Sequence, residues 1–290
     1  QFMRNVNPDT LTELLEGLSG PATDPRLQEV LSALVRHLHA FAKEVNLTHD
    51  EWRKGLELLT RAGEISDDKR NEFVLFSDVL GLSSLVDMIN SPKGCTSSSV
   101  LGPFHVLDAP ELPVGGDLIG DNEGQQVVVE GKVLDQSGTP IEGAKIELWQ
   151  TADNGLYSGQ DPSQPEYNLR MSMITGADGR YAVSTIRPTP SMVPTDGPVG
   201  DLLKATGRHA WRPSHLHFIV QATGFRTLVT EVFPDDDPYL DEDAVFGVRS
   251  DLIMEYRPGN AADLASDLAA QGRLSSDFSK VDFDFVLPPE

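Results

Sequence analysis

The sequence contains one cysteine, Cys95, among its 290 residues. A single thiol cannot form an intramolecular disulfide, so nothing in the sequence indicates an oxidising compartment. The sequence also lacks an apolar run of about 18 residues, the length that a membrane-spanning helix requires. A charged segment followed by an apolar one, typical of a secretory leader, is missing as well. We therefore expect a cytoplasmic protein without a membrane span.

Basic residues are scarce in this sequence. There are 23 Lys and Arg residues against 45 Asp and Glu residues, which gives a formal net charge of -22 at pH 7. A surface this acidic repels phosphate groups, so neither nucleic acids nor anionic lipids are expected as partners. With 39% hydrophobic and 23% charged residues, the chain has the composition of a globular protein that buries a substantial core.

Apolar residues at helical spacing occur throughout the first third of the sequence. The longest such stripe covers residues 27–41, and Thr48 with Glu51 forms a capping-box pattern at the start of another helix. A further helical segment extends from about residue 67 to residue 88. Together these patterns predict an N-terminal helical domain over residues 1–90.

The pattern changes in the remaining two thirds of the sequence. Residues 91–124 are rich in Gly, Pro, Ser and Asp without a sustained period, which predicts a long connecting segment. Over residues 125–290, short β-branched runs alternate with turn residues and no helices come between them. This predicts an antiparallel β-sandwich. The expected fold class is therefore mostly β with α, a helical domain followed by a β-sandwich.

Two histidines, His215 and His217, stand two residues apart in one of the predicted strands. Successive side chains of a strand point to opposite faces, so these two imidazoles project from the same side. They are able to share one metal ion at about 2.0–2.1 Å. By itself the pair fits a metal site and two structural histidines equally well.

Tyr157 strengthens the metal interpretation because it follows another predicted strand, in the loop Gly155-Leu156-Tyr157-Ser158. A tyrosinate is a hard, anionic oxygen donor that suits a ferric ion, and two imidazoles would complete a mixed nitrogen and oxygen set. Without the histidine pair, Tyr157 would be interpreted as an ordinary core or surface aromatic residue.

Several segments, taken in order, resemble those of the intradiol ring-cleavage dioxygenases, and within them the hydroxyquinol and catechol 1,2-dioxygenase group. The resemblance covers nearly the whole chain, and the run Thr-Asp-Gly-Pro-Val-Gly at 195–200 is most similar to the hydroxyquinol branch. The similar segments are residues 72–81, 100–104, 147–150, 155–157, 167–170, 195–200, 207–209 and 212–217.

The resemblance implies a non-haem ferric ion, Fe(III), bound by two tyrosines and two histidines. Three of these positions match, namely Tyr157, His215 and His217. Ser191 occupies the position of the second tyrosine, and Met192 replaces a proline that is usual there. A serine hydroxyl is too weak an acid to replace a phenolate near neutral pH. We therefore expect weaker iron retention and slower deprotonation of the diol, with some activity retained.

The resemblance also assigns catalytic and substrate-binding roles. Arg212, placed beside the histidines by the irregular Pro213, would stabilise negative charge on the ring, although a surface salt bridge is the alternative. Asp78 is a carboxylate in an apolar helix, and we expect it to accept a hydrogen bond from a third ring hydroxyl. The positions that match the family's substrate pocket are Leu75, Asp78, Val100, Leu101, Gly102, Pro103, Phe104, Val193, Arg212, Glu231 and Val245.

The function implied by the resemblance is intradiol cleavage of hydroxyquinol or catechol by O2, which gives maleylacetate or cis,cis-muconate. The partners implied are the small aromatic diol, O2 and a second copy of the chain bound through the N-terminal helices. Two alternatives remain. One is a homologue that has lost ring cleavage and only binds a phenolic ligand or a metal, which Ser191 favours. The other is a metal-dependent hydrolase in which the three ligands bind zinc.

Overall fold

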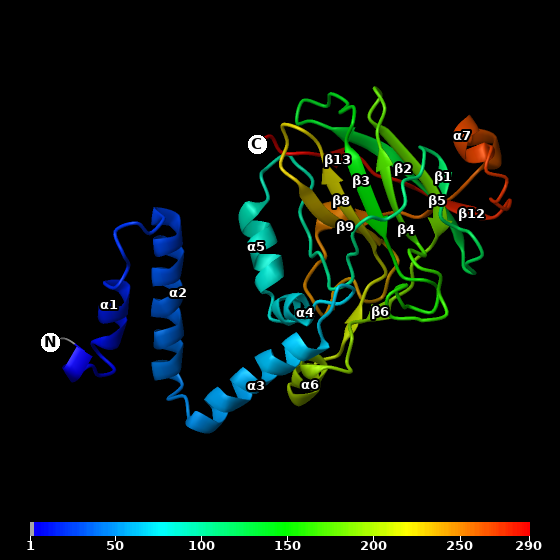
Figure 1. The fold of residues 1–290 in the computed structure, drawn as a ribbon. Coiled ribbons are helices and arrows are strands. Elements are labelled where there is room, and N and C mark those ends of the chain that lie inside the picture. Colours follow the sequence, from blue (N-terminus) through cyan, green and yellow to red (C-terminus); the bar gives the residue numbers. More distant parts are fainter. Residues whose placement is uncertain (1–2) are drawn as a thin grey trace. The chain divides into compact units, whose positions relative to one another are not determined.

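The computed structural model describes residues 3–290 (Figure 1). The chain divides into two compact units, residues 1–60 and 61–290. None of the helices in the described range is both long and apolar enough to cross a membrane. The predicted division of the chain at residues 90 and 124 stays a prediction.

The first unit consists of helices. After a short 3-10 turn, Met3–Asn5, come α1 (Leu11–Glu16), α2 (Pro25–Glu44) and most of α3 (His49–Ile65). The Asp24 side chain accepts a hydrogen bond from the Leu27 backbone N–H at 2.8 Å and thereby caps α2.

The capping box predicted at the start of α3 is present. The Thr48 backbone N–H donates to the Glu51 carboxylate at 2.9 Å, and the Glu51 backbone N–H donates to Thr48 Oγ1 at 3.2 Å. Neither α1 nor α2 contains a fully buried residue, so the apolar stripe of α2 is half exposed in the single chain.

The second unit begins with two short helices, α4 (Glu72–Val79) and α5 (Leu82–Asn90). The sequence pattern predicted one continuous helical segment here, and that prediction was wrong. Gly81 adopts a left-handed conformation with φ 76° and stands between the two helices. Glycine adopts such a conformation at little steric cost, so the chain turns at this point. Apolar spacing alone does not reveal the turn, because the spacing continues across it.

Two sheets, of six and five strands, form a β-sandwich around one apolar core. The six-stranded sheet has the order β1-β5-β2-β12-β11 with β13 also on β2, and the five-stranded sheet has the order β10-β9-β8-β3-β4. The strands of the first sheet are β1 (Gly116–Asp117), β2 (Gln126–Leu134), β5 (Arg180–Ile186), β11 (Arg257–Pro258), β12 (Phe278–Asp282) and β13 (Phe285–Val286). Those of the second are β3 (Lys145–Trp149), β4 (Arg170–Ile174), β8 (Leu216–Gln221), β9 (Leu228–Pro234) and β10 (Ile253–Met254).

The predicted fold class is confirmed, but the sheets are mixed and not purely antiparallel. β2 pairs in parallel with β12 and β13, and the pairs β1–β5 and β9–β10 are also parallel. Alternating apolar residues indicate which face of a strand is buried but not the direction of its neighbour. Long connections bring these partners together, and their course does not follow from local pattern.

Smaller elements complete the second unit. A two-stranded sheet pairs β6 (Ser191–Met192) with β7 (Trp211–Arg212), and α6 (Pro198–Ala205) lies between them in the sequence. The remaining elements are α7 (Ser266–Ala269) and the 3-10 turns Ser250–Leu252 and Ala261–Asp263.

Strand β8 determines where the site lies. Leu216 and Phe218 are fully buried in the core between the sheets. The residues that alternate with them, including His217, point to the opposite face of the five-stranded sheet. On that face Trp149 and Ile219 pack with Tyr157 and with the chain segment that contains Phe104. The histidines are therefore buried under loops and not within the sandwich core.

Candidate active site

The two histidines meet as the strand pattern predicted. Their Nε2 atoms are 3.1 Å apart and their rings are nearly perpendicular, at 89°. His215 Nδ1 lies 2.7 Å from the backbone oxygen of Pro213. A carbonyl oxygen only accepts, so Nδ1 carries the proton and Nε2 presents a lone pair toward His217. Both side chains are buried, at 3% and 2% exposure.

Tyr157 brings an oxygen to the same point. Its hydroxyl lies 3.1 Å from His215 Nε2. The residue follows Gly155, whose φ of 77° lets the loop turn back toward the sheet. The ring packs against Phe104 at a centroid distance of 5.0 Å. One phenol oxygen and two imidazole nitrogens therefore converge in a buried space.

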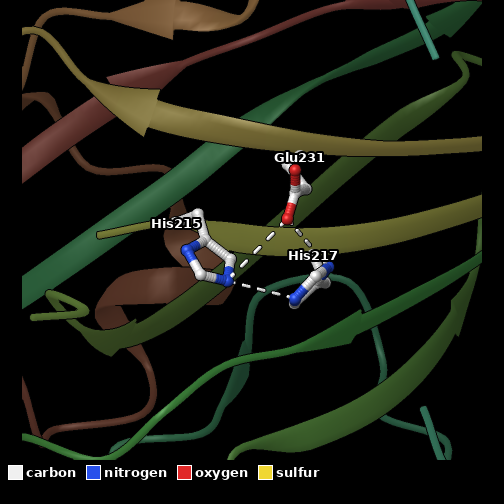
Figure 2. A group of neighbouring side chains, drawn as sticks. All are labelled: His215, His217 and Glu231. Carbon is white, nitrogen blue, oxygen red and sulfur yellow. Dashed lines mark hydrogen bonds and ion pairs between the residues drawn. The ribbon is translucent and has the colours of Figure 1, made fainter. Parts of the chain in front are cut away.

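Glu231 is the third member of a group that could bind a metal ion, with His215 and His217 (Figure 2). Its Oε1 lies 3.4 Å from His217 Nδ1 and 3.8 Å from His215 Nε2. Both carboxylate oxygens already interact with Arg212, at 2.7 and 3.0 Å, and Oε2 accepts from Ser99 at 2.6 Å. Glu231 faces the Nδ1 side of His217, but this Nδ1 has no hydrogen-bond partner among the described residues.

Arg212 is buried between two carboxylates. Its guanidinium interacts with Glu231 and, at 2.9 and 3.1 Å, with Asp243. Nη1 also lies 3.2 Å from His215 Nε2. Burial alone would lower the pKa of Arg212, but Asp243 and Glu231 raise it well above its usual value. The side chain is therefore a permanent cation beside the donor atoms.

The histidines are held in their neutral form. Burial lowers the pKa of His215 below its usual value, and the positive charge of Arg212 lowers it further. For His217, burial and the neighbouring His215 lower the pKa well below that value. Neutral imidazoles are the form that binds metals. Glu231 and the Pro213 carbonyl favour a proton on His215, but burial and Arg212 outweigh them. The donor set of this structure therefore fits a metal ion.

The segment of residues 100–104 passes directly over His217. A Cβ on Gly102 would lie 3.1 Å from His217 Cε1, and Gly102 has a φ of 72°, so no larger residue fits without strain. Trp149 stacks on the imidazole at a centroid distance of 4.8 Å, with an angle of 4° between the rings. The ring of His217 is thus held by contacts with both Trp149 and the segment of Gly102.

Six of the predicted substrate-binding residues belong to two apolar clusters. Leu75, Val100, Val193 and Val245 belong to one cluster, and Leu101 and Phe104 pack with Tyr157 in the other. A small inner cavity reaches the donor atoms. It is lined by Pro103, Phe104, Tyr157, Ser191, Met192, Val193, Pro194, Arg212, His215 and His217.

Ser191 lies beside Arg212, its partner in the β6–β7 pair, and lines the inner cavity. A larger outer pocket of about 650 Å³ shares five residues with that cavity. The shared residues are Phe104, Ser191, Met192, Val193 and Pro194. The short, polar Ser191 side chain therefore lines both the outer pocket and the inner cavity that contains Tyr157, His215 and His217.

Asp78 lies in α4 and is 1% exposed. Its Oδ1 has no hydrogen-bond partner among the described residues. Burial raises the pKa of Asp78 to about 7, although Ser83 and Arg212 act in the opposite direction. An unpartnered buried carboxyl group is costly, and it suits a ligand that brings a hydroxyl.

Three residues at the site were not predicted from the sequence. Asp243 follows a run of acidic residues typical of an exposed loop, and only the fold buries it against Arg212. Trp149 belongs to a predicted strand, but its stacking on His217 depends on the register between β3 and β8. Arg170 begins β4 without any local signal that its charge lies beside Tyr157.

Two family models match the chain. The model described as "Dioxygenase" matches residues 109–289, and the model described as "Catechol dioxygenase N terminus" matches residues 24–96. The chain belongs to the intradiol ring-cleavage dioxygenases. The predicted family and enzyme class are thereby confirmed.

Similar proteins agree with this assignment. The hydroxyquinol 1,2-dioxygenase of Rhizobium sp. (strain MTP-10005) is 47% identical over 91% of this chain and 90% of its own. The structure of hydroxyquinol 1,2-dioxygenase from Pseudomonas putida DLL-E4 is similar with a TM-score of 0.81 and 43% identity, and covers 98% of this chain and 97% of its own. The structure of wild-type Acinetobacter radioresistens catechol 1,2 dioxygenase is similar to this chain with a TM-score of 0.81 and 30% identity. The similarity covers 99% of this chain and 94% of that one.

The raised pKa of Asp78 predicts that the stability difference between this protein and its Asp78→Asn variant depends on pH. An aspartate in the unfolded chain ionises near pH 4, whereas folded Asp78 retains its proton up to about pH 7. Between these values a rise in pH favours the unfolded state. The free energy of unfolding of the metal-free protein should therefore fall relative to Asp78→Asn from pH 5 to 7, by up to about 1.4 kcal/mol per pH unit.

Urea unfolding of both proteins at several pH values measures this difference. Because both proteins share every other titrating group, their difference isolates Asp78. A difference that stays constant from pH 5 to 7 would show that folded Asp78 ionises normally.

Proposed function

We propose that this protein cleaves hydroxyquinol (benzene-1,2,4-triol) or catechol with O2 at a non-haem ferric ion bound by Tyr157, His215 and His217. The ring breaks between its two hydroxyl-bearing carbons and gives maleylacetate, after tautomerisation, or cis,cis-muconate. This proposal rests on one observation: Tyr157 Oη and His217 Nε2 each lie 3.1 Å from His215 Nε2. The names of the similar hydroxyquinol and catechol dioxygenases support the substrate class.

The donor set supports iron over zinc. A phenolate is a hard anionic donor that prefers a ferric ion, and imidazoles bind iron as well as zinc. Tyr157, His215 and His217 would hold the ferric ion, which would supply a Lewis acid for the diolate and so favour reaction of the ring with O2. Burial raises the pKa of free Tyr157 above its usual value, so the phenolate form depends on the metal and on nearby cations.

The chain's own residues orient the substrate. Arg212 places a permanent positive charge 3.2 Å from His215 Nε2, where it stabilises negative charge on the ring oxygens. Phe104 and Val193 line the inner cavity and exclude water from the aromatic ring. Ser191 supplies neither the charge nor the basicity of a tyrosine, so we expect weak metal retention and slow removal of the diol protons.

Visible absorption of the purified protein with quantified iron tests the proposal. We expect a tyrosinate-to-iron band that shifts when hydroxyquinol is added without O2, because the diol becomes a ligand. Tyr157→Phe should abolish the band. A band that does not shift when the diol is added would favour the alternative of a homologue that has lost ring cleavage and only binds a metal or a phenol. The serine at position 191 is the feature that supports this alternative. A colourless protein that contains zinc would favour the hydrolase.

Asp78 is proposed to select the triol. Its unpartnered Oδ1 would accept a hydrogen bond from the third ring hydroxyl, which hydroxyquinol has and catechol lacks. A hydrogen bond to a charged group contributes roughly 1.5–3 kcal/mol, so above pH 7, where Asp78 is ionised, Asp78→Ala should reduce the ratio of kcat/KM for hydroxyquinol over catechol at least about tenfold. Steady-state oxygen uptake with both substrates measures the ratio. Val79→Ala, a buried neighbour in the same helix, should leave the ratio unchanged, and an unchanged ratio in Asp78→Ala would contradict the assignment.

A second copy of the chain is proposed to cover the apolar face of α2. Six large apolar residues of this helix are between 45% and 54% exposed in the single chain: Leu27, Val30, Leu31, Leu34, Leu38 and Phe41. A contiguous exposed apolar face of this kind is uncommon on monomers and is typical of an interface. Association of identical helices would bury it symmetrically.

The double substitution Leu34→Glu and Leu38→Glu should convert the proposed dimer into a monomer, because it buries two unpaired charges in the interface. Light scattering coupled to size-exclusion chromatography measures the mass. Ala40→Glu, on another side of the same helix, is the matched control and should remain dimeric. A monomeric parent protein at the same concentration would contradict the proposal.

A further inference from the structure

Arg170 is a buried cation that has no carboxylate partner within residues 3–290. Its side chain is 3% exposed. Nε donates to Ser158 Oγ at 2.9 Å and Nη1 donates to the Phe104 backbone oxygen at 2.7 Å, while Nη2 has no partner among the described residues. Both acceptors are neutral. A buried charge normally requires an opposite charge, and Arg212 in the same site has two.

Tyr157 is a group close to Arg170 that is able to carry a negative charge. The Arg170 guanidinium carbon lies 5.8 Å from the centre of that ring. A cation over an aromatic face is stabilised by the electron density of the ring, and a phenolate ring carries more of it than a phenol. The acceptors of Arg170 also belong to the residue after Tyr157 and to Phe104, which packs on the same ring.

The backbone before Arg170 is strained in a way that holds this arrangement. Tyr167 and Leu169 both have positive φ values, 59° and 55°. Such conformations are unfavourable for residues with a Cβ, and they concentrate where function requires a fixed geometry. The strained turn is joined to the end of β3, because the Gln150 backbone N–H donates to the Leu169 oxygen at 3.3 Å.

We propose that Arg170 is a positioning residue, which holds Tyr157 at the proposed metal site by placing a positive charge over its ring. This inference rests on the proposed iron site. Arg170 touches neither substrate nor metal in this scheme. It acts through Tyr157, and its hydrogen bonds to Ser158 and Phe104 fix the two chain segments between which the phenol ring lies.

The substitutions Arg170→Gln and Arg170→Lys separate the charge from the hydrogen bonds. Glutamine retains a donor without the charge, and lysine retains the charge without the planar fork. We expect the tyrosinate-to-iron band of Arg170→Gln to move to longer wavelength, because phenolate electrons lie higher in energy without the cation. Its iron affinity, measured by competition with a chelator, should fall roughly tenfold. Arg170→Lys should remain close to the parent protein in both measurements.

Arg180→Gln is the matched control, since Arg180 is a part-buried arginine of the other sheet with two carboxylate partners, Glu130 and Asp267. It should change neither the band nor the iron affinity. The proposal would be overturned if Arg170→Gln had the parent's tyrosinate-to-iron band and iron affinity. It would also be overturned if the band of Arg170→Lys shifted as far as the band of Arg170→Gln. Should Arg170→Gln fail to fold, Arg170→Lys decides by comparison with the parent protein: a band at longer wavelength than the parent's, or an iron affinity about tenfold lower, would overturn the proposal. A parent protein that binds iron without any tyrosinate band would overturn the proposed iron site together with this inference.

Discussion

The ion cluster of Arg212, Glu231 and Asp243 is the constraint on which the rest of the site depends. Its three charges are almost completely excluded from water. Removal of one partner from such a cluster typically costs about 3–5 kcal/mol, because the remaining charge stays buried. The cluster joins β7, β9 and the loop before Gly247, whose N–H donates to Asp243 at 2.9 Å. Charges this tightly paired fix the positions of the strands that carry them.

The donor atoms take their positions from that cluster. Glu231 faces His217, and Arg212 lies against His215, so both imidazoles contact a member of the cluster. Ser99 bonds to Glu231 directly before the segment that passes over His217. The proposed metal ligands, the wall of the cavity and the proposed anion-stabilising arginine are thus coupled through buried polar contacts and not through flexible loops alone.

The sequence was informative where a local period determines the structure. The two-residue spacing of His215 and His217 placed both rings on one face, and the capping box at Thr48 marked the start of α3. It was not informative where distant segments meet. The parallel pairing of β2 with β12, and the burial of Asp243 from an acidic loop, depend on contacts between residues far apart in the chain. Arg170 belongs to a segment that resembles the family, yet only the folded structure shows that it is buried with an unpartnered Nη2.

Alternate residues of strand β8 contribute to the hydrophobic core and to the candidate active site. Leu216 and Phe218 fill the core, while His217 and Ile219 face the site. A change of side chain affects one of these faces, whereas the insertion or deletion of one residue exchanges them, since the period of a strand is two. The loops around the cavity are free to vary in length during evolution, but β8 is not. Diversification of this protein is therefore expected to proceed in β8 by substitution and in the surrounding loops by insertion.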